Sequence, residues 1–484
     1  MAYESQGKLN TFEQVVSFME GFTNLERRTD KYSVRTYRLD RMQALMQRLG
    51  DPQDSYSTIH VAGSKGKGST ASFIAKGLEA KGFRVGLYMS PHVSDYRERF
   101  TLCGRFIDDA TLIETGNDLK ERLEGFRFCD TLGENDPTTF ELYTAFAFIL
   151  FKRMGCQWAV IETGLGGRLD ATNILKPKAC VITPIELEHT NILGDTIEKI
   201  AIEKSKITKP LTPVFVSPQK PEAASVFRNE AKAQKAPIHE FDDEVTELGT
   251  SFSNGVQKVD VHFKDGFSTQ YELTMLGDVQ AQNSALALMV LRSLGLYVPG
   301  ETEKAFEGNR LPGRMESIGW ERPLILDGAH THNSMDHLLY TFRQLHPGKE
   351  GLCIFGAVEG KDHSSMAESI LRAFDKVIVS RPGTFKKSDP KALYDLMTDT
   401  ASANAEFKGK EIHLECEAED ALGLAKGITK SGEPILVCGS FYLAGAVKEA
   451  LARLEAKTPR EPKAPNEPKA RKDDNAPKED KACH

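Results

Sequence analysis

The sequence predicts an α/β protein with a doubly wound parallel plan and two domains, and its short apolar runs carry most of that prediction. These runs are rich in β-branched residues, alternate with longer helical patterns, and lie at 58–62, 84–89, 158–163, 179–184, 213–217, 323–328, 352–357, 376–380, 412–416 and 434–440. Most segments between them are long enough for the crossover helices that parallel strands require. With 484 residues, 40% of them hydrophobic, the chain can bury more than one core.

A different pattern interrupts the series at about 240–275. Residues alternate there around Asn254-Gly255 and Asp265-Gly266, dipeptides that favour tight hairpin turns, so we expect a small antiparallel β insertion. Pro299 and Gly300 then end a helical segment and a new series of strands begins, which places the domain boundary near 298–312. The expected units are residues 1–300, residues 301–455, and a charged, disordered tail at 456–484 that lacks the apolar residues of a core.

Composition narrows the possible classes of function. A formal charge of −7 argues against a general nucleic-acid binder. Residues 1–10 have neither a basic start nor an apolar run, and the longest apolar block, 145–151, is far shorter than the roughly 18 residues of a membrane span. Eight scattered cysteines without a CxxC pair indicate reduced, buried thiols. We therefore expect a cytoplasmic protein without nucleic-acid or membrane partners, and nothing in the sequence demands more than a monomer.

The segment GSKGKGS at 63–69 has the composition of a phosphate-binding loop but not the usual spacing. In the usual GxxxxGK pattern a Ser or Thr follows the lysine directly, whereas here Val61 stands at the first glycine and Gly68 at the hydroxyl. The loop follows a predicted strand, and we expect Ser69 to open a helix behind it. Backbone N–H groups would then cradle phosphate, and Lys67 would reach the β and γ phosphates. The alternative is a glycine-rich turn with solvated lysines.

Three further polar residues lie where predicted strands end. Ser90 follows the strand at 84–89, Glu162 ends the strand at 158–163, and His189 lies just past the strand at 179–184. The carboxyl ends of parallel strands share one edge of a sheet, here the edge with the glycine-rich loop. Hydroxyl, carboxylate and phosphate oxygens suit Mg²⁺. Singly, each residue has a simpler explanation as a turn, surface or loop residue, but together they predict a magnesium site.

These residues resemble the folylpolyglutamate synthase and dihydrofolate synthase family of the Mur ligase superfamily, whose phosphate loop has the form GTxGKGS. The likeness covers about residues 30–450 and includes, in order, RLDRMQALMQRLG, SPHV, PTTFELYTA, ETGLGGRLDATN, LEHTNILGDTIEKIAIEKSKI, QAQNSALAL, LPGRME, DGAH and VCGSFYLAG. It implies an N-terminal P-loop mononucleotide-binding domain with a parallel sheet and a C-terminal Rossmann-like α/β domain that acts as a glutamate ligase domain.

The resemblance implies that ATP drives the addition of L-glutamate to the γ-carboxylate of a reduced folate, releasing ADP and phosphate. A carboxylate does not react with an amine at neutral pH because its leaving group would be oxide, so it must first become an acyl phosphate. Such a site has to neutralise phosphate charge and exclude water. By resemblance, the residues that bind ATP are Ser64, Lys65, Gly66, Lys67, Gly68, Ser69, Asn283, Arg314, Asp327 and His330.

The resemblance also assigns the metal site. It implies two Mg²⁺ ions, one held by Ser90 and Glu162 and the second held in part by His189, with K⁺ as an optional cofactor. Lys204 matches the lysine that the superfamily carbamylates, which turns a cation into a carboxylate that can orient the second ion. Lys67, Lys204 and His189 are the expected catalytic residues. The sequence leaves open that Lys204 is an ordinary helix-surface lysine.

The same likeness assigns the organic substrates. Reduced folate or dihydropteroate is expected at Thr138, Thr139, Phe140 and Glu141 and at Leu169, Asp170 and Ala171, and glutamate, on weaker grounds, at Lys361 and Ser440.

Three departures from the family pattern and three alternatives stand beside this interpretation. Thr331 and His332 follow DGAH where the family has Asn and Pro, Lys206 adds like charge near Lys204, and Glu188 replaces the commoner Asp before His189. The nearest alternative is a bifunctional enzyme that also makes dihydrofolate from dihydropteroate. A nucleotide switch with slow NTPase activity would not use a second α/β domain, and the ETGLGGRLDATN segment argues against a cell-wall precursor ligase of the same superfamily.

Overall fold

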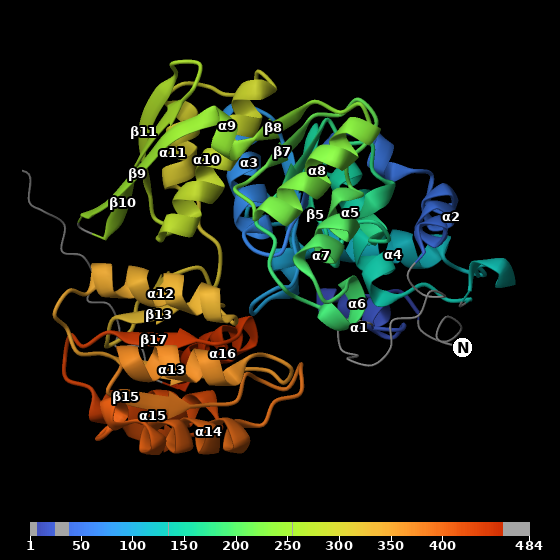
Figure 1. The fold of residues 1–484 in the computed structure, drawn as a ribbon. Helices are drawn as coiled ribbons and strands as arrows, with labels where there is room; N and C mark the ends of the chain where they lie inside the picture. Colours follow the sequence, from blue (N-terminus) through green and yellow to red (C-terminus); the bar gives the residue numbers. More distant parts are fainter. Residues whose placement is uncertain (1–6, 25–37, 134, 254, 458–484) are drawn as a thin grey trace, which may run out of the picture.

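The structure, a computed structural model, describes residues 7–24, 38–133, 135–253 and 255–457. These residues form two α/β units and a small β insertion (Figure 1). The tail expected at 456–484 lies outside the described residues except for 456–457, which end the last helix. Within the described part of the chain, none of the helices is both long and apolar enough to cross a membrane.

The first unit is built on an eight-stranded sheet of order β4-β3-β2-β5-β1-β6-β7-β8. Its strands are β1 (Ser57–Ala62), β2 (Val85–Tyr88), β3 (Phe100–Leu102), β4 (Arg105–Phe106), β5 (Trp158–Glu162), β6 (Ala179–Ile182), β7 (Val214–Val216) and β8 (Ile238–Glu240). Six of them run parallel, whereas β3 and β4 form an antiparallel edge that the sequence did not predict. Strands of three and two residues are too short to show a run of apolar residues.

Helices cover both faces of this sheet. The α-helices of the first unit up to the insertion are α1 (Phe12–Glu20), α2 (Leu39–Leu49), α3 (Lys67–Ala80), α4 (Asp109–Arg122), α5 (Thr139–Arg153), α6 (Thr190–Leu193), α7 (Ile197–Ser205), α8 (Pro221–Ala233) and α9 (Phe241–Glu244). Along β5, Ala159 and Ile161 join a core with α1, α2, α4 and α5, while Val160 joins the opposite core with α3. Successive strand residues point to opposite faces, so an uninterrupted apolar run fits a strand buried on both sides.

The β insertion has the predicted antiparallel form. It comprises β9 (Val245–Ser253), β10 (Val256–Phe263) and β11 (Ser268–Leu273), in the order β11-β10-β9. Val259, Val261 and Tyr271 of this small sheet pack into the same core as α3 and the next helix, α10 (Asp278–Ser293). The insertion is thereby attached to the first unit.

The second unit is a doubly wound sheet of order β12-β13-β17-β14-β15-β16, parallel except for β12. Its strands are β12 (Glu316–Ile318), β13 (Leu324–Leu326), β14 (Leu352–Phe355), β15 (Lys376–Val379), β16 (Glu411–Leu414) and β17 (Ile435–Cys438). Its helices are α12 (His332–Leu345), α13 (His363–Ala373), α14 (Pro390–Ala403), α15 (Ala418–Ile428) and α16 (Phe441–Lys457). Cys353 and Phe355 face α12, α13 and α14, and Leu352 and Ile354 face α15 and α16. The predicted two-domain α/β class is confirmed.

The helix α11 (Glu301–Glu307) bears on the domain boundary. Its Phe306 is buried in the core of the first unit, where its ring meets that of Phe73 edge to face at 5.1 Å between centroids. Pro299 and Gly300 lie in the turn between α10 and α11. We propose that the boundary lies at 308–315, after α11, and not at 300/301.

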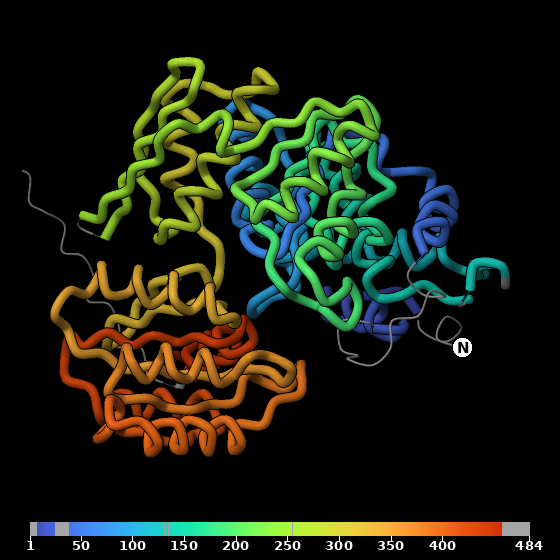
Figure 2. Tube along the Cα trace, viewed as in Figure 1, coloured from blue at the N-terminus to red at the C-terminus, as the bar shows by residue number. Residues whose placement is uncertain are grey.

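The two units meet where α16 begins. Figure 2 follows the chain from the first unit, blue to yellow, into the second, orange to red. Gly445 of α16 lies so close to the carbonyl oxygen of Val93, in the loop after β2, that a Cβ atom would overlap it. Only glycine allows this approach, and it brings the start of α16 to the carboxyl edge of the first sheet.

Candidate active site

The phosphate loop runs from Gly63 to Gly66, and α3 begins at Lys67, two residues before the expected Ser69. Gly66 adopts φ +79°, a left-handed conformation that favours glycine, and the first helical turn follows it directly. Gly66 is the N-cap residue and has no side chain that could accept from the first helical turn. The first N–H groups of a helix have no partner within it, so those of 67–69 are available to an anion.

Asn283 of α10 fixes the junction between loop and helix. Its Oδ1 lies against Gly66, where a Cβ atom would overlap it, and accepts a hydrogen bond from Thr70 Oγ1 at 3.3 Å. Asn283 Nδ2 donates to Gln280 Oε1 at 3.2 Å. The structure thus brings this expected ATP-binding residue to the loop from a segment more than 200 positions away.

Glu162 lies beside the loop at the end of β5. Its Oε1 is 3.7 Å from Lys67 Nζ, and its Oε2 accepts from the backbone N–H of Ser90 at 3.3 Å. Burial raises the pKa of Glu162, and Lys67 opposes that rise. The structure therefore brings Lys67, Ser90 and Glu162 together as expected from the strand exits.

Two unpartnered hydroxyls support a cation at this place. Ser69 Oγ and Thr163 Oγ1 are both buried and have no hydrogen-bond partner among the described residues, an arrangement that costs free energy unless a ligand fills it. Ser69 lies in the first turn of α3 and Thr163 directly follows Glu162 at the end of β5, and hydroxyl and carboxylate oxygens are ligands that Mg²⁺ prefers. No group of three or more His, Cys, Asp or Glu side chains in the described ranges could hold a metal alone, so phosphate oxygens and waters would complete the set. Sequence reasoning missed Thr163, although it directly follows Glu162.

Lys204, in the last turn of α7, is not a surface residue. Its side chain is 2% exposed, and Nζ donates to Gly63 O at 2.7 Å and to Glu188 Oε1 at 2.9 Å. Burial lowers the pKa of Lys204, and Glu188 opposes that change. Burial also disfavours the Glu188 carboxylate, yet Lys204 and Lys67 hold its pKa well below the ordinary range. Lys204 therefore contacts the phosphate loop directly.

The contacts around Lys204 explain how the structure accommodates two of the departures from the family pattern. Lys206 pairs with Glu230 of α8, so its charge does not crowd Lys204. Glu188, one methylene longer than Asp, is the partner of Lys204. The exposed side chain of His189 lies near the charges of Glu188 and Lys361.

The second unit reaches the phosphate loop through His330. Its Nδ1–H donates to Gly328 O at 2.7 Å, which leaves Nε2 as the acceptor for Lys65 Nζ at 3.3 Å. Burial keeps the pKa of His330 well below its ordinary value, and the Lys65 charge adds to that effect. The neutral imidazole can therefore accept from the ammonium group.

Two further residues expected to bind ATP lie on either side of β13. Asp327 accepts hydrogen bonds from the backbone N–H groups of Met315 and Ala329. The guanidinium carbon of Arg314 lies 4.1 Å from the ring centroid of Phe441. Burial lowers the pKa of Arg314, and the charges of Asp327 and Glu162 oppose that change. Thr331, one of the departures, caps α12 by accepting from Ser334 N.

The residues expected to bind folate divide into two sets. Thr138 and Glu141 form a reciprocal cap at the start of α5, and the Glu141 carboxylate also pairs with the fully buried Arg41 at 3.0 Å. Thr139 Oγ1 donates to Met19 O at 3.1 Å. All three side chains therefore form hydrogen bonds or an ion pair with other residues of the protein. The half-buried Phe140 packs against Gly164 instead, and we propose that it is the member of this set that contacts the substrate.

Asp170 likewise accepts hydrogen bonds from residues of its own loop. Oδ2 accepts from Leu165 N at 2.7 Å, and Oδ1 accepts from both the N–H and the hydroxyl of Thr172. The hydroxyl in turn lies 2.8 Å from Nε2 of the fully buried His60. We propose that Asp170 shapes the loop and that the neighbours Leu169 and Ala171 are nearer to a ligand.

The two residues expected to bind glutamate also differ. Ser440 is 4% exposed, and its Oγ accepts from Tyr442 N at 3.1 Å at the start of α16. Lys361 is half-buried; burial lowers its pKa, and the charge of Glu188 opposes that change. We propose that Lys361 is the stronger of the two candidates for a carboxylate ligand.

His60 gives a prediction for the pH dependence of stability. Burial lowers its pKa to about 3, while an unfolded histidine titrates near pH 6.5. Between these values the unfolded chain binds one proton more, so stability is lost as the pH falls. His60→Gln keeps a donor for Thr172 without a titrating ring. As the pH falls, the unfolding free energy of this variant should decrease less than that of the parent, by about 1.4 kcal/mol per pH unit. Urea unfolding of both chains at several pH values below 6.5 checks this, and identical pH profiles would contradict it.

Comparisons with known proteins agree with this geometry. The model of the Mur ligase middle domain matches residues 61–291, and that of the Mur ligase glutamate ligase domain matches residues 313–441. A Bacillus subtilis protein named dihydrofolate synthase/folylpolyglutamate synthase is 31% identical, over 85% of this chain and 94% of its own length.

Solved structures show the same relationship. A Mycobacterium tuberculosis folylpolyglutamate synthase complexed with ADP superposes with a TM-score of 0.79 at 26% identity, covering 90% of this chain and 97% of the other. A complex described as FPGS-AMPPCP-folate reaches 0.75 at 26% identity, covering 91% and 100%. The chain therefore belongs to the folylpolyglutamate synthase/dihydrofolate synthase family of the Mur ligases, which are ATP-dependent amide ligases.

Proposed function

We propose that this chain adds L-glutamate to the γ-carboxylate of a reduced folate with ATP, releasing ADP and phosphate. The main support for the proposal is that both units contribute residues around the phosphate loop. In the first unit, Lys67, Glu162 and Lys204 lie beside the loop. In the second unit, His330 contacts Lys65 of the loop. A ligase needs this arrangement because it must bring ATP and two anionic substrates together and exclude water.

The reaction proceeds in two balanced steps. A folate carboxylate oxygen attacks the γ-phosphorus, the bond to the ADP oxygen breaks, and ADP leaves. The glutamate nitrogen then attacks the acyl carbon and loses a proton, and phosphate leaves with the former carboxylate oxygen. Lys67 and the N–H groups at the start of α3 stabilise the charge of the transferring phosphoryl group. Lys361 is placed to attract a substrate carboxylate near Glu188.

Two Mg²⁺ ions would supply further positive charge to the phosphates. Ser69, Thr163, Ser90 and Glu162 are the residues that suit the first ion, and His189 with a carbamylated Lys204 the second. The carbamate forms when the neutral Lys204 amine attacks CO₂ and releases a proton, and burial favours that neutral amine. The resemblance also implies K⁺, which a comparison of rates in potassium and sodium buffers checks. A monomer in the reducing cytoplasm is the proposed state.

Dihydrofolate synthesis is the second candidate activity, because the Bacillus subtilis relative carries both names. Release of ADP by the purified protein, with Mg²⁺ and ATP, separates the candidates. Tetrahydrofolate, dihydropteroate and no acceptor are compared, each with and without glutamate. We expect turnover with tetrahydrofolate only when glutamate is present. Turnover with dihydropteroate as well would establish a bifunctional enzyme, and ADP release that ignores both substrates would indicate a nucleotide switch.

A further inference from the structure

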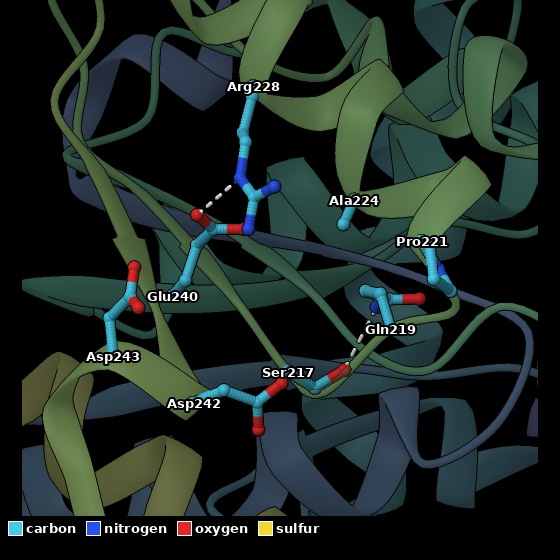
Figure 3. Close-up of a pocket in the computed structure, with 8 residues that line it drawn as sticks. All are labelled: Ser217, Gln219, Pro221, Ala224, Arg228, Glu240, Asp242 and Asp243. Atoms are coloured by element: carbon cyan, nitrogen blue, oxygen red, sulfur yellow. Dashed lines mark hydrogen bonds and ion pairs between the residues drawn. The ribbon is translucent and has the colours of Figure 1, made fainter.

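A cavity of about 220 Å³ opens where β7 and β8 end, at the same edge of the sheet as the phosphate loop (Figure 3). Gln219, in the loop between β7 and α8, forms one wall, and Arg228 of α8 forms another. Arg228 pairs with Glu240 at 2.7 Å, and its side chain is 59% exposed. Gln219 is half-buried and has a different set of partners, none of which belongs to this ion pair.

The Gln219 amide holds the backbone on both sides of Pro184. Its Oε1 accepts from Ile185 N at 3.1 Å, and its Nε2 donates to Thr183 O at 3.1 Å and to Ser217 Oγ at 3.0 Å. Pro184 between them has no N–H of its own. The side chain thus supplies both a donor and an acceptor to the segment that leaves β6. Figure 3 shows its further contact with Ser217, which follows β7.

The segment that Gln219 contacts, Thr183 to Ile185, in turn forms hydrogen bonds with the start of the phosphate loop. Pro184 O accepts from the backbone N–H groups of Ser64 at 2.9 Å and of Lys65 at 3.2 Å. Ser64 Oγ donates to Glu186 O at 3.1 Å. The same segment leads within a few residues to Glu188, the partner of Lys204. A change in the position of Pro184 would therefore move the first residues of the loop.

We propose that Gln219 is a positioning residue for nucleotide binding, acting through Pro184 on the phosphate loop. It touches neither ATP nor the reacting atoms. Loss of its amide leaves Thr183 O and Ile185 N without these partners, and the loop can then leave the geometry that binds phosphate. The proposal deepens the proposed function, since it concerns the ATP site of that ligase, but binding of nucleotide tests it independently of ligation.

The test compares Gln219→Met with Arg228→Met, a matched change in the same cavity. The probe is AMPPCP with Mg²⁺, titrated calorimetrically, together with the KM for each substrate and the melting temperature. We expect Gln219→Met to weaken AMPPCP binding and raise the KM for ATP about tenfold, the equivalent of one or two hydrogen bonds. The KM values for folate and glutamate should stay within about twofold.

Several results would overturn the proposal. These are unchanged AMPPCP affinity in Gln219→Met, an equal loss in Arg228→Met, or a rise of all three KM values in step with a lower melting temperature. A parent chain that binds AMPPCP but ligates no glutamate would refute the proposed function while the titration still decides on Gln219. A parent that binds no nucleotide would refute both.

Discussion

Lys67→Ala is expected to lose nearly all ligation. Lys67 stands at the first position of α3 with Nζ 3.7 Å from Glu162, where we propose that the phosphate groups of ATP bind. Removing one charged donor from a transferring oxyanion commonly costs on the order of a hundredfold or more in rate, or roughly 3 kcal/mol. The loss should appear in kcat because the phosphoryl group carries its shifting charge in the transition state. Steady-state rates of ADP release with saturating substrates measure it.

Lys76→Ala is the matched control for this change. Lys76 lies on the same helix and pairs with Glu79, away from the loop. Its loss should leave kcat within about twofold, because the pair is partly exposed, lies away from the loop and contributes little. Near-normal turnover of Lys67→Ala with an intact fold would refute the assignment of the phosphate loop, and an equal loss in both variants would point to a general effect on α3.

Lys204→Ala is the second change with a large expected effect. The variant should be nearly inactive and still bind ATP through Lys67 and the first Mg²⁺, because a carbamate at 204 would serve the second ion. A cationic ammonium there would be repelled by that ion. Short carboxylic acids should restore some turnover by occupying the vacated space, and removal of bicarbonate should slow the parent enzyme. Carbamylation should increase as the pH rises, since only the neutral amine reacts.

The controls for Lys204 separate its charge states. In the structure the amine donates to Gly63 O and Glu188, so rescue by a small amine, and not by a carboxylic acid, would show that the unmodified ammonium is the working form. Lys206→Ala should keep its activity, since Lys206 pairs with Glu230. High-resolution electron density of a magnesium-bound complex that shows an unmodified amine at 204 would contradict carbamylation.

Local patterns were enough to predict most of the parallel strands, the hairpin insertion and the glycine-rich loop, but not the parallel strand β8. Each rests on neighbouring residues: Ile59 and Val61 make a buried strand, and Asp265-Gly266 makes a turn. The short edge strands β3 and β4 carry no such pattern, and Pro299-Gly300 gives the same signal for an interhelical turn as for a domain boundary.

The partners of each site residue could not be predicted in the same way. The sequence motif around 138–141 marked those residues as a site, but the contact of Glu141 with Arg41 depends on tertiary packing across 100 positions. The hydrogen bond between Lys65 and His330 joins separate units. Gln219 lies in no motif, and Thr163 lies in one without being marked as a ligand, so only their buried or bonded side-chain atoms reveal them.

Transfer of labelled oxygen tests the central claim, formation of an acyl phosphate, most directly. Folate labelled with oxygen-18 in the γ-carboxylate is incubated with the protein, ATP, Mg²⁺ and glutamate, and the released phosphate is analysed by mass spectrometry. Because the acyl–oxygen bond breaks when the glutamate nitrogen attacks, one labelled oxygen should appear in each phosphate formed together with the amide product. Unlabelled phosphate, released by water attack on ATP without a glutamylated product, would contradict the proposed reaction.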